Sequence, residues 1–439
     1  MNTPKILIPH LELNGIDTFE TYRKNKGFEA LETALQMNSP QALLSTLKES
    51  GLRERSHTGF PVGLHWEFVA AAPDEERVVI LNADEGEPGC FKDRYVCEKS
   101  PFLVLEAMLI TGFTVGAKRG FLFLRREFSA ITKKLTEALK QLHENNLLGK
   151  NILKSSFSFE IEIILGAGGY TFGDERIVLE TLEGRKGQGR IQHPYPTIAG
   201  FHEHPTLIGD LETILFVPFI LRNGSKWFRN LGIPSFPGTT LFCVSGRIQT
   251  PGIYEVPIGS TIEQILSLAG GALQGEKVTA VSPGGVGSSI IPQSLFSTPL
   301  EPSAMSALDL HFGNGALIVY SDRCCLVDIA LHITKFFAEE SCGRCAPCRE
   351  GTRRLHETIR KLTDARFRTS AERTQTRPEL ALPALPELLK RLGETLRLTS
   401  RCSFGRRAAA AVEGIIRYFP EEFNAHLVRQ ECRQGVCRL

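Results

Sequence analysis

An apolar strand that ends in an acidic turn decides the fold of this chain. It reads Arg77-Val-Val-Ile-Leu-Asn-Ala83 and continues into Asp84-Glu-Gly-Glu-Pro-Gly89. An apolar run at Phe102–Ala117 follows and is typical of a helix. The alternation continues with a strand at 120–124, an amphipathic helix at Ala130–Asn146 and a strand at Phe157–Leu165. Strands that alternate with helices predict a mostly parallel sheet covered on both faces.

Two glycine-rich turns lie where such a sheet binds ligands. The turns at 84–89 and 166–173 both follow strands, so they meet at the carboxyl edge of the sheet. The second contains Gly166, Gly168, Tyr170 and Gly173 and runs into Asp174-Glu175. Glycines in such a turn let main-chain N–H groups approach a phosphate closely. The turn alone does not identify the ligand.

The pattern changes twice further along the chain. From about Gly238, short β segments, a helix at Thr261–Ala269 and strands around Val278 and Leu317 predict a small α+β module. From Val327 onward the pattern is helical, with a polar loop at 366–377. Residues 30–47 carry a helical pattern in a peripheral lead-in. We therefore expect a multidomain α/β plus α protein with parts at 1–50, 51–236, 237–320 and 321–439.

Composition excludes several classes of function. The chain has 439 residues, 42% of them hydrophobic and 23% charged, with a formal net charge of +2, which is typical of a globular protein without a large electrostatic field. We expect no nucleic-acid partner. The longest apolar stretch, Ile214–Leu221, is far shorter than the roughly 20 residues that a membrane span needs. No secretory signal is visible at the N-terminus, so we expect a cytoplasmic protein without a membrane span.

Cysteines gather near the C-terminus, where eight of the 11 lie within the last 116 residues. In a reducing compartment, clustered cysteines bind metal more often than they form disulfides. Cys342, Cys345 and Cys348 have the C-x2-C-x2-C spacing that binds three irons of a [4Fe–4S] cluster, and Cys402 is the best-placed fourth ligand. A zinc ion on the same four cysteines is the alternative. Zinc usually takes its ligands in pairs, so the spacing favours the cluster.

A second group of metal-ligand residues stands at the end of the chain. His426, Cys432 and Cys437 supply three ligands, and Cys325, or its neighbour Cys324, supplies a fourth. Three cysteines and one histidine are a frequent structural zinc composition. The alternative is a tail with unliganded cysteines. The remaining cysteines are expected to be buried thiols, namely Cys90, Cys97 and Cys243.

Several separated motifs occur in the order found in one known family. They are Asn82–Gly89, Phe91-Lys-Asp-Arg94, the turn at 166–173, Leu182-Glu-Gly184, the cysteine motif at 341–352 and Cys402-Ser-Phe-Gly405. From about residue 50 to about 425 the chain resembles the flavin- and NADH-binding subunit of respiratory complex I. The relatives of that subunit are the diaphorase subunits of NAD-linked hydrogenases and formate dehydrogenases.

The resemblance implies both a fold and a function. It implies a Rossmann-like domain for FMN and NAD(P)H, a ubiquitin-like β-grasp module of the soluble-ligand-binding type, and a helical bundle with one [4Fe–4S] cluster. Such a diaphorase subunit passes electrons from NAD(P)H through FMN to the cluster, because a flavin exchanges electrons in pairs or singly. The implied partners are a [2Fe–2S] thioredoxin-like subunit and an iron–sulfur or catalytic subunit, such as a hydrogenase or formate dehydrogenase.

The resemblance also assigns roles to individual residues. It implies that Asn82, Asp84 and Glu85 contact the flavin and that Glu87 contacts the nucleotide. Phe60 and Tyr195 are implied aromatic partners of the dinucleotide rings. The remaining implied cofactor contacts are Gly166, Gly168, Tyr170, Gly173, Asp174 and Glu175. In the hydrogenase branch a similar tail of histidine and cysteines binds zinc, which favours zinc over unliganded cysteines here.

The phosphate-binding loop departs from the family pattern. The family has Gly-Arg-Gly-Gly-x-Gly-Phe-Pro-x-Gly-x-Lys-Trp, whereas residues 54–66 place Glu54, Ser56 and His57 at glycine positions and His65 at the lysine. Losing a charged donor to a phosphate costs on the order of 1.5–3 kcal/mol, or one to two decades of affinity. Two further positions depart from the family. The segment from Gly209 to Thr213 replaces the family's Asn-Asn-Val-Glu-Thr, and Gln192 replaces a basic residue.

Two hypotheses account for these departures. In the first, the chain is a working diaphorase in which Arg55, His57 and His65 take over phosphate contacts, Thr213 still faces the flavin, and Arg176 admits NADPH. In the second, it is a flavin-free paralogue that serves as an iron–sulfur relay or scaffold. The intact turns at 82–89 and 166–173 favour the first. A third class of function is a plain interaction module, in which the segment around 245–254 binds a partner and nothing else.

Overall fold

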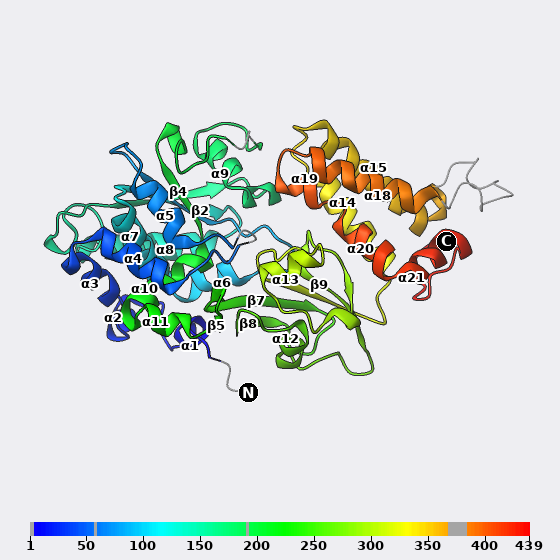
Figure 1. Ribbon diagram of the computed structural model, residues 1–439, viewed down its shortest axis with the longest axis horizontal. Helices are drawn as coiled ribbons and strands as arrows, with labels where there is room; N and C mark the ends of the chain where they lie inside the picture. The colour runs from blue at the N-terminus through cyan, green and yellow to red at the C-terminus, as the bar shows by residue number, and fades with distance from the viewer. Residues whose placement is uncertain (1–3, 57–58, 190–192, 368–383) are drawn as a thin grey trace. The chain divides into compact units, whose positions relative to one another are not determined.

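The computed structural model describes residues 4–56, 59–189, 193–367 and 384–439, which Figure 1 traces from the N-terminus to the C-terminus. The predictions for His57, Gln192 and the loop beyond Phe367 therefore lie outside the described residues. The chain forms two compact units. Unit 1 comprises Met1–Gly86, Cys90–Cys243 and Ile253–Ser260, and unit 2 comprises Glu87–Gly89, Val244–Gly252 and Thr261–Leu439.

A four-stranded parallel sheet forms the centre of unit 1, which confirms the parallel sheet predicted from the strand and helix alternation. Its strands are β1 (Val78–Ala83), β2 (Arg119–Arg125), β3 (Glu160–Gly166) and β4 (Thr206–Asp210), in the order β3-β2-β1-β4. β1 and β2 are buried along almost their whole length. Their nearly continuous apolar sequences follow from this, because both faces of a parallel sheet are covered.

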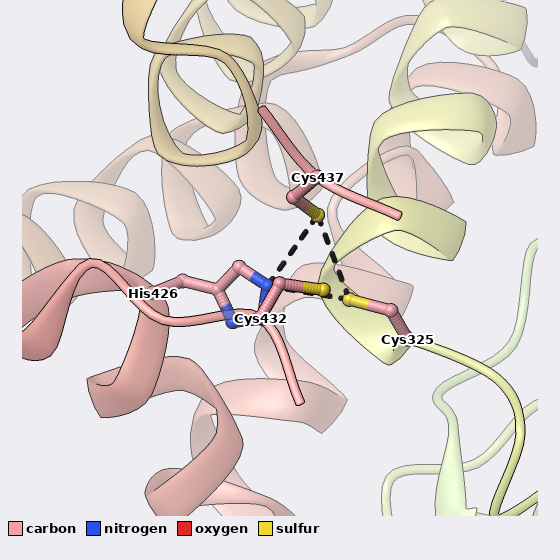
Figure 2. A group of neighbouring side chains, drawn as sticks. All are labelled: Cys325, His426, Cys432 and Cys437. Carbon is pink, nitrogen blue, oxygen red and sulfur yellow. Dashed lines mark hydrogen bonds between the residues drawn. The ribbon is translucent and has the colours of Figure 1, made fainter. Parts of the chain in front are cut away.

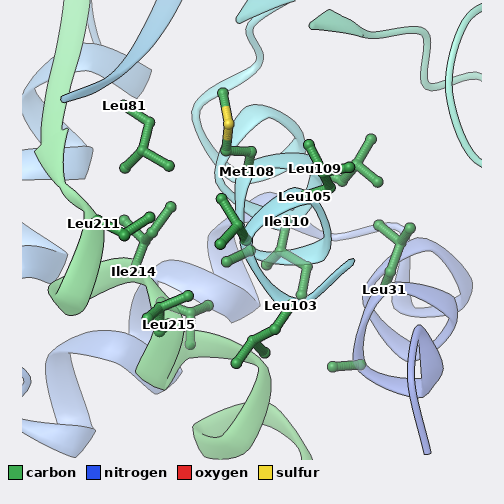
Figure 3. Close-up of a cluster of buried hydrophobic side chains, with 14 of the residues drawn as sticks. Leu31, Leu81, Leu103, Leu105, Met108, Leu109, Ile110, Leu211, Ile214 and Leu215 are labelled. Atoms are coloured by element: carbon green, nitrogen blue, oxygen red, sulfur yellow. The ribbon is translucent and has the colours of Figure 1, made fainter. Parts of the chain in front are cut away.

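Helices surround this sheet. They are α5 (Val62–Ala70), α6 (Lys92–Lys99), α7 (Pro101–Val115), α8 (Ser129–Glu144), α9 (Glu175–Leu182), α10 (Leu211–Asn223) and α11 (Ser225–Arg229), with short turns η1 (Ile152–Lys154), η2 (Tyr170–Gly173) and η3 (Phe201–Glu203). Every residue of α7 is buried, which suits a helix that is apolar on all sides. Figure 3 shows Leu103 and Ile110 of α7 in the same cluster as Leu215 of α10 and Leu31.

The N-terminal residues belong to the core of unit 1 and form α1 (Leu7–Leu11), α2 (Phe19–Lys24), α3 (Glu29–Met37) and α4 (Pro40–Ser50). The buried Glu106 carboxylate of α7 accepts hydrogen bonds from Tyr22 Oη at 2.5 Å and Phe28 N at 3.0 Å. The expected helix at 30–47 is interrupted after Met37, because Asn38 is left-handed and Ser39 caps a new helix with Pro40 in its first turn.

A second sheet has the order β10-β9-β11-β7-β8. Its strands are β7 (Thr239–Gly246), β8 (Gly252–Pro257), β9 (Val278–Val286), β10 (Ile291–Pro292) and β11 (Ala316–Ser321). The helix α12 (Ile262–Leu268) begins with a capping box between Thr261 and Gln264. The other short elements are β5 (Gly232–Ile233), β6 (Phe236–Pro237), η4 (Gln293–Leu295) and α13 (Pro302–Ala307). These elements confirm the strand and helix pattern predicted after Gly238.

After β11 the described chain is helical, as the sequence pattern predicts. Its elements are α14 (Leu326–Glu339), α15 (Ala346–Thr363), η5 (Ala365–Phe367), α18 (Ala384–Thr399), α19 (Ser403–Arg407), α20 (Ala410–Tyr418), α21 (Pro420–Asn424) and the π-type turn η6 (Ala425–Arg429). Leu355, Ile359 and Leu362 line the buried face of α15. Among the helices that the structure describes, none is long and apolar enough to cross a bilayer.

Candidate functional site

The carboxyl edge of the parallel sheet gathers polar residues from three strands and a glycine from the fourth. Asn82 on β1 pairs in register with Asp210 on β4, and Arg125 on β2 pairs with Gly166 on β3. The chain runs outward from β1 through β2 to β3 and then returns to the other side of β1 as β4. The topology therefore reverses between β1 and β4, which is where open α/β sheets bind ligands.

Asp84 offers an unused acceptor at this edge. Its side chain is buried, its Oδ1 accepts from Arg125 Nη1 at 3.2 Å, and its Oδ2 has no hydrogen-bond partner among the described residues. A Cβ built on Gly166 would lie 2.5 Å from that oxygen, so only glycine leaves this approach open. Burial raises the pKa of Asp84 to about 6, although the Arg125 charge opposes the rise. Among the described residues, Asp84 Oδ2 therefore keeps an acceptor for a hydrogen-bond donor of a ligand.

Arg125 is a site residue that the sequence reasoning missed. Besides Asp84 it donates to the carbonyl oxygen of Gly168, and thereby ties the glycine turn to the end of β1. The available signal was a charged residue directly after the apolar strand Phe121–Leu124. Gly168 has a φ of +85°, a conformation that favours glycine.

Asn82 and Glu85 are held by neighbouring groups of the protein. Asn82 Nδ2 donates to Phe172 O at 3.0 Å, and its Oδ1 accepts from Asp84 N at 3.1 Å. Glu85 accepts from Arg94 Nε and from Asp93 N, each at 2.8 Å. Glu85 thus positions the first turn of α6, and Asn82 joins β1 to the turn at 170–173.

In the described part of the altered loop, Glu54, Arg55 and His65 bond to other groups of the protein. Glu54 Oε1 lies 2.7 Å from His65 Nδ1, and both side chains are largely buried. Arg55 is 2% exposed, and its guanidinium donates to the main-chain oxygens of Thr239, Pro237 and Arg53 at 2.7–3.1 Å. Burial lowers the pKa of Arg55 to about 10.

Thr213 connects this loop to α10. Its Oγ1 accepts from Arg55 N at 2.7 Å and donates to Asp210 Oδ2 at 2.7 Å. The donors of Arg55 are therefore directed at groups of unit 1 itself.

The start of α9 holds the next predicted pair. Asp174 caps α9 and binds Arg176 through two contacts, Nε to Oδ1 at 3.0 Å and Nη2 to Oδ2 at 2.8 Å. Burial raises the pKa of Glu175, and the His65 charge opposes this, which places His65 within electrostatic range of Glu175. In the turn before α9, Tyr170 is buried and Gly173 has open space beside it.

The two aromatic residues predicted to stack on the nucleotide are accessible. Phe60 is 38% exposed and Tyr195 is 43% exposed. The Tyr195 ring packs edge-on against His193, with centroids 4.6 Å apart. Glu87, in contrast, belongs to unit 2, where its carboxylate accepts from Val286 N at 2.9 Å and leaves room only for glycine at position 285.

The four cysteines predicted to hold a cluster come together in unit 2. Cys345 caps α15, Cys348 lies in its first turn, and Cys402 caps α19. Burial, together with the charges of Cys345, Cys402 and Cys342, raises the pKa of Cys348 to about 12. The positive ends of two helices face these thiols, which fits a cluster with thiolate ligands. Ser341 Oγ lies 3.3 Å from Cys348 Sγ.

Figure 2 shows the second group, in which Cys325, His426, Cys432 and Cys437 point toward one another. Their ligand atoms all lie within 4.8 Å of one another. Cys325 Sγ is 3.8 Å from Cys437 Sγ and 3.3 Å from His426 Nε2. A tetrahedral zinc ion with Zn–S bonds of about 2.3 Å separates sulfur ligands by about 3.8 Å.

Two further hydrogen bonds orient the ligand atoms of this group. His426 Nδ1 bonds Glu422 O at 2.9 Å, and Cys325 accepts from Asp328 N at 3.4 Å. Such bonds fix the ring nitrogen and the sulfur that face a metal. The donor set therefore fits zinc.

Three family models match parts of this chain. Residues 47–218 match the family model of the Nuo51 FMN-binding domain, residues 328–426 the iron–sulfur binding region of NADH-ubiquinone oxidoreductase, and residues 241–288 the SLBB domain. The chain is 35% identical to an NADH-quinone oxidoreductase subunit of Rhizobium meliloti, over 97% of this chain and 98% of that protein. It is 32% identical to the HndC subunit of the NADP-reducing hydrogenase of Solidesulfovibrio fructosivorans, over 96% and 83% of the two chains.

A solved structure has the same fold. The crystal structure of NAD+-reducing [NiFe]-hydrogenase in the H2-reduced state matches with a TM-score of 0.81 and 31% identity, over 97% of this chain and 67% of that one. Fold and site together define a redox subunit that joins an FMN-binding domain to an iron–sulfur region. The chain belongs to the family of NADH-quinone oxidoreductase subunits that contain these two regions, together with their hydrogenase relatives, which confirms the resemblance seen in the sequence motifs.

Proposed function

We propose that this chain is the electron-entry subunit of a cytoplasmic multisubunit oxidoreductase. It oxidises NAD(P)H at unit 1 and delivers electrons singly from a [4Fe–4S] cluster in unit 2. The proposal is supported by the two matched regions and by relatives named as NADH-quinone oxidoreductase and hydrogenase subunits. A bound flavin supplies the conversion between paired and single electrons.

The residues of unit 1 would bind and orient the cofactor. Asp84 supplies an acceptor beside Gly166, and Arg125 holds this carboxylate against the glycine turn. The exposed rings of Phe60 and Tyr195 are available for stacking on a dinucleotide. In this proposal unit 1 contains the Rossmann-like domain expected at 51–236.

The single observation that carries the proposal is the cysteine group of unit 2. Three thiols lie at the N-termini of α15 and α19, and the charges of the other three predicted ligands all act on Cys348. Cys342, Cys345, Cys348 and Cys402 would each bind one iron of a [4Fe–4S] cluster. We assign this cluster to a helical domain at 321–439 and the second sheet to a β-grasp module at 237–320.

Serine substitution tests the cluster. We expect Cys402→Ser to lose the broad visible absorbance and most of the iron of the anaerobically purified protein, because serine is a poor ligand for iron in such clusters. Cys97→Ser, a buried thiol of unit 1, is the matched control and should retain both. Full iron and unchanged absorbance in Cys402→Ser would contradict the ligand assignment.

Zinc and partner subunits complete the proposal. Cys325, His426, Cys432 and Cys437 would hold a structural zinc ion that fixes the end of the chain. Electrons from the cluster require an acceptor, so we infer a [2Fe–2S] thioredoxin-like subunit and an iron–sulfur or catalytic subunit as partners. A hydrogenase or a formate dehydrogenase fits this role.

A further inference from the structure

The place where an anion would bind in unit 1 already contains carboxylates. The N-terminus of α10 follows β4 at the point where the strand order reverses, and both a helix N-terminus and such a reversal favour a bound phosphate. Here Asp210 caps the helix. Its Oδ1 accepts from Thr213 N at 2.9 Å and its Oδ2 from Thr213 Oγ1 at 2.7 Å. The negative charge at the N-terminus of α10 is therefore supplied by the carboxylate of Asp210 and not by a ligand.

A second carboxylate lies in the same region. Glu54 forms the 2.7 Å contact with His65, and its charge acts on both Asp210 and Glu175. Burial raises the pKa of Asp210 and of Glu175, and the Glu54 charge raises each further. A phosphate dianion placed among these groups would add like charge to a buried acidic region.

The cationic side chains that act on these carboxylates already have partners within the protein. Lys92 Nζ lies 2.9 Å from Glu212 Oε2 and 3.1 Å from Asp93 Oδ1. Arg176 is bound by Asp174. His65 is bound by Glu54, and the guanidinium of Arg55 donates to main-chain oxygens. Lys92, Arg176, His65 and Arg55, as far as the structure describes the chain, are thus bonded to the protein itself.

Asp84, at the same edge of the sheet, differs from Asp210 because one of its oxygens has no hydrogen-bond partner among the described residues. Asp84 is 6% exposed, and its Oδ2 is aimed at Gly166 without a hydrogen-bond partner among the described residues. Such an acceptor suits an uncharged donor, for example a ribityl hydroxyl or a ring N–H. The described residues of the site therefore suit the uncharged part of a flavin, whereas the carboxylates of Glu54 and Asp210 disfavour its phosphate.

We propose that unit 1 binds a flavin without a phosphate, that is riboflavin, with Glu54 and Asp210 in the place of the phosphate of FMN. The proposal rests on the proposed function, in which unit 1 is the flavin-binding domain. It concerns which flavin the site selects. It also predicts that inorganic phosphate does not compete with the flavin.

Direct binding to the full-length, cluster-containing protein tests the proposal after resident flavin has been removed. Quenching of flavin fluorescence is measured under anaerobic conditions with riboflavin and with FMN. We expect riboflavin to bind at least tenfold more tightly than FMN, with no competition from inorganic phosphate. Equal or tighter binding of FMN would overturn the proposal, and so would failure of both flavins to bind.

A double substitution supplies a test that misfolding cannot imitate, because it predicts a gain. Glu54→Gly combined with His65→Lys removes the carboxylate and restores a cation, so we expect FMN affinity to rise at least tenfold while riboflavin affinity changes less than threefold. The control is Glu76→Gly with His204→Lys, a Glu–His pair at 3.1 Å on the residues that precede β1 and β4. No gain of FMN affinity in the first variant, or an equal gain in the control, would contradict the proposal.

The proposed function can fail independently of this inference. If FMN binds more tightly than riboflavin and NADH still reduces the cluster, the electron-entry role stands and the flavin preference is wrong. If riboflavin binds as expected but neither NADH nor NADPH reduces the cluster, the preference stands and the electron-entry role is wrong.

Discussion

The buried Asp84 carboxylate provides a hydrogen-bond acceptor at the site and destabilises the ligand-free folded protein. It is buried, it has only Arg125 as a cationic partner, and one of its oxygens is unpaired within the described part of the chain. Burying a charge with so little compensation destabilises the folded state. The arrangement is explained if a ligand completes the hydrogen bonding of Asp84.

Removing this charge should stabilise the ligand-free protein in a pH-dependent way. The pKa of Asp84 is about 6 in the folded protein against an ordinary 3.8, so the ionised group destabilises the fold above about pH 6, and the cost disappears below about pH 3.8. We expect Asp84→Asn to raise the free energy of unfolding by about 1–2 kcal/mol at pH 8 and by less at pH 5. Urea unfolding at both pH values measures this. A larger gain at pH 5 would contradict the pKa assignment.

Arg176 carries the prediction about nucleotide choice. Asp174 holds its guanidinium at the N-terminus of α9, where an anion is favoured. If the 2′-phosphate of NADPH replaces Asp174 as the partner of this guanidinium, Arg176→Ala should weaken NADPH binding by about tenfold and NADH binding much less. Arg185→Ala, a more exposed arginine of unit 1, is the control. Equal weakening of both nucleotides would show that Arg176 does not distinguish them.

Some residue roles could be predicted from the sequence and others could not. The acidic turn and the clustered cysteines were visible as local patterns, and the structure brings both sets of predicted metal ligands together. The contacts of Arg55 were not visible, because its partners Thr239 and Pro237 lie more than 180 residues away in the sequence. A substituted residue shows that a loop has changed, but its new partners depend on the folded chain.

At the scale of elements, two helices meet at the cysteine group. The N-terminus of α19 approaches α15 so closely that a Cβ on Gly405 would lie 3.0 Å from Cys348 Cβ and 2.5 Å from Ser400 Oγ. The Cys-x-x-Gly pattern therefore has a packing reason, since glycine lets the loop with Cys402 reach the first turn of α15.

Gly405→Ala tests this packing. The added methyl group should push α19 away from α15, so we expect iron content to fall by about half or more, with weaker visible absorbance. Gly173→Ala is the control, because a Cβ there meets nothing within 4 Å. Normal iron content in Gly405→Ala would show that the close approach is not needed for cluster binding.

The elements also show where local patterns fail. The strands and helices of the parallel sheet were predictable because their apolar runs are long and regular. The interruption between α3 and α4 was signalled by Ser39-Pro40. The inclusion of residues 4–50 in the core depends on long-range bonds, such as those from Ile6 and Leu7 to Glu255, and no local pattern reveals them.

At the scale of the whole molecule, the C-terminal tail is bound to the start of the helical region. Cys325 lies before α14, whereas the other three members of the group lie in the last 14 residues. A metal on these four residues would close a loop of about a hundred residues, and binding energy at such a site stabilises the fold.

Removal of this metal is therefore expected to destabilise the protein without affecting the cluster. We predict that His426→Ala loses one equivalent of zinc and retains its iron. Its midpoint of thermal unfolding should fall by about 2–4 °C for each kcal/mol by which the free energy of unfolding decreases. Elemental analysis and thermal unfolding measure these quantities, with the exposed His332→Ala as control. Absence of zinc from the unsubstituted protein would contradict the site.

The proposed path, in which electrons enter at unit 1 and leave through the cluster of unit 2, is tested most directly by anaerobic titration with NADH and NADPH. The cluster is followed by electron paramagnetic resonance in the complete protein with flavin bound. We expect substoichiometric reduced nucleotide to produce the signal of a reduced [4Fe–4S] cluster, and this signal to be lost in Cys402→Ser. A cluster that dithionite reduces, but that neither nucleotide reduces when flavin is bound, would contradict this path.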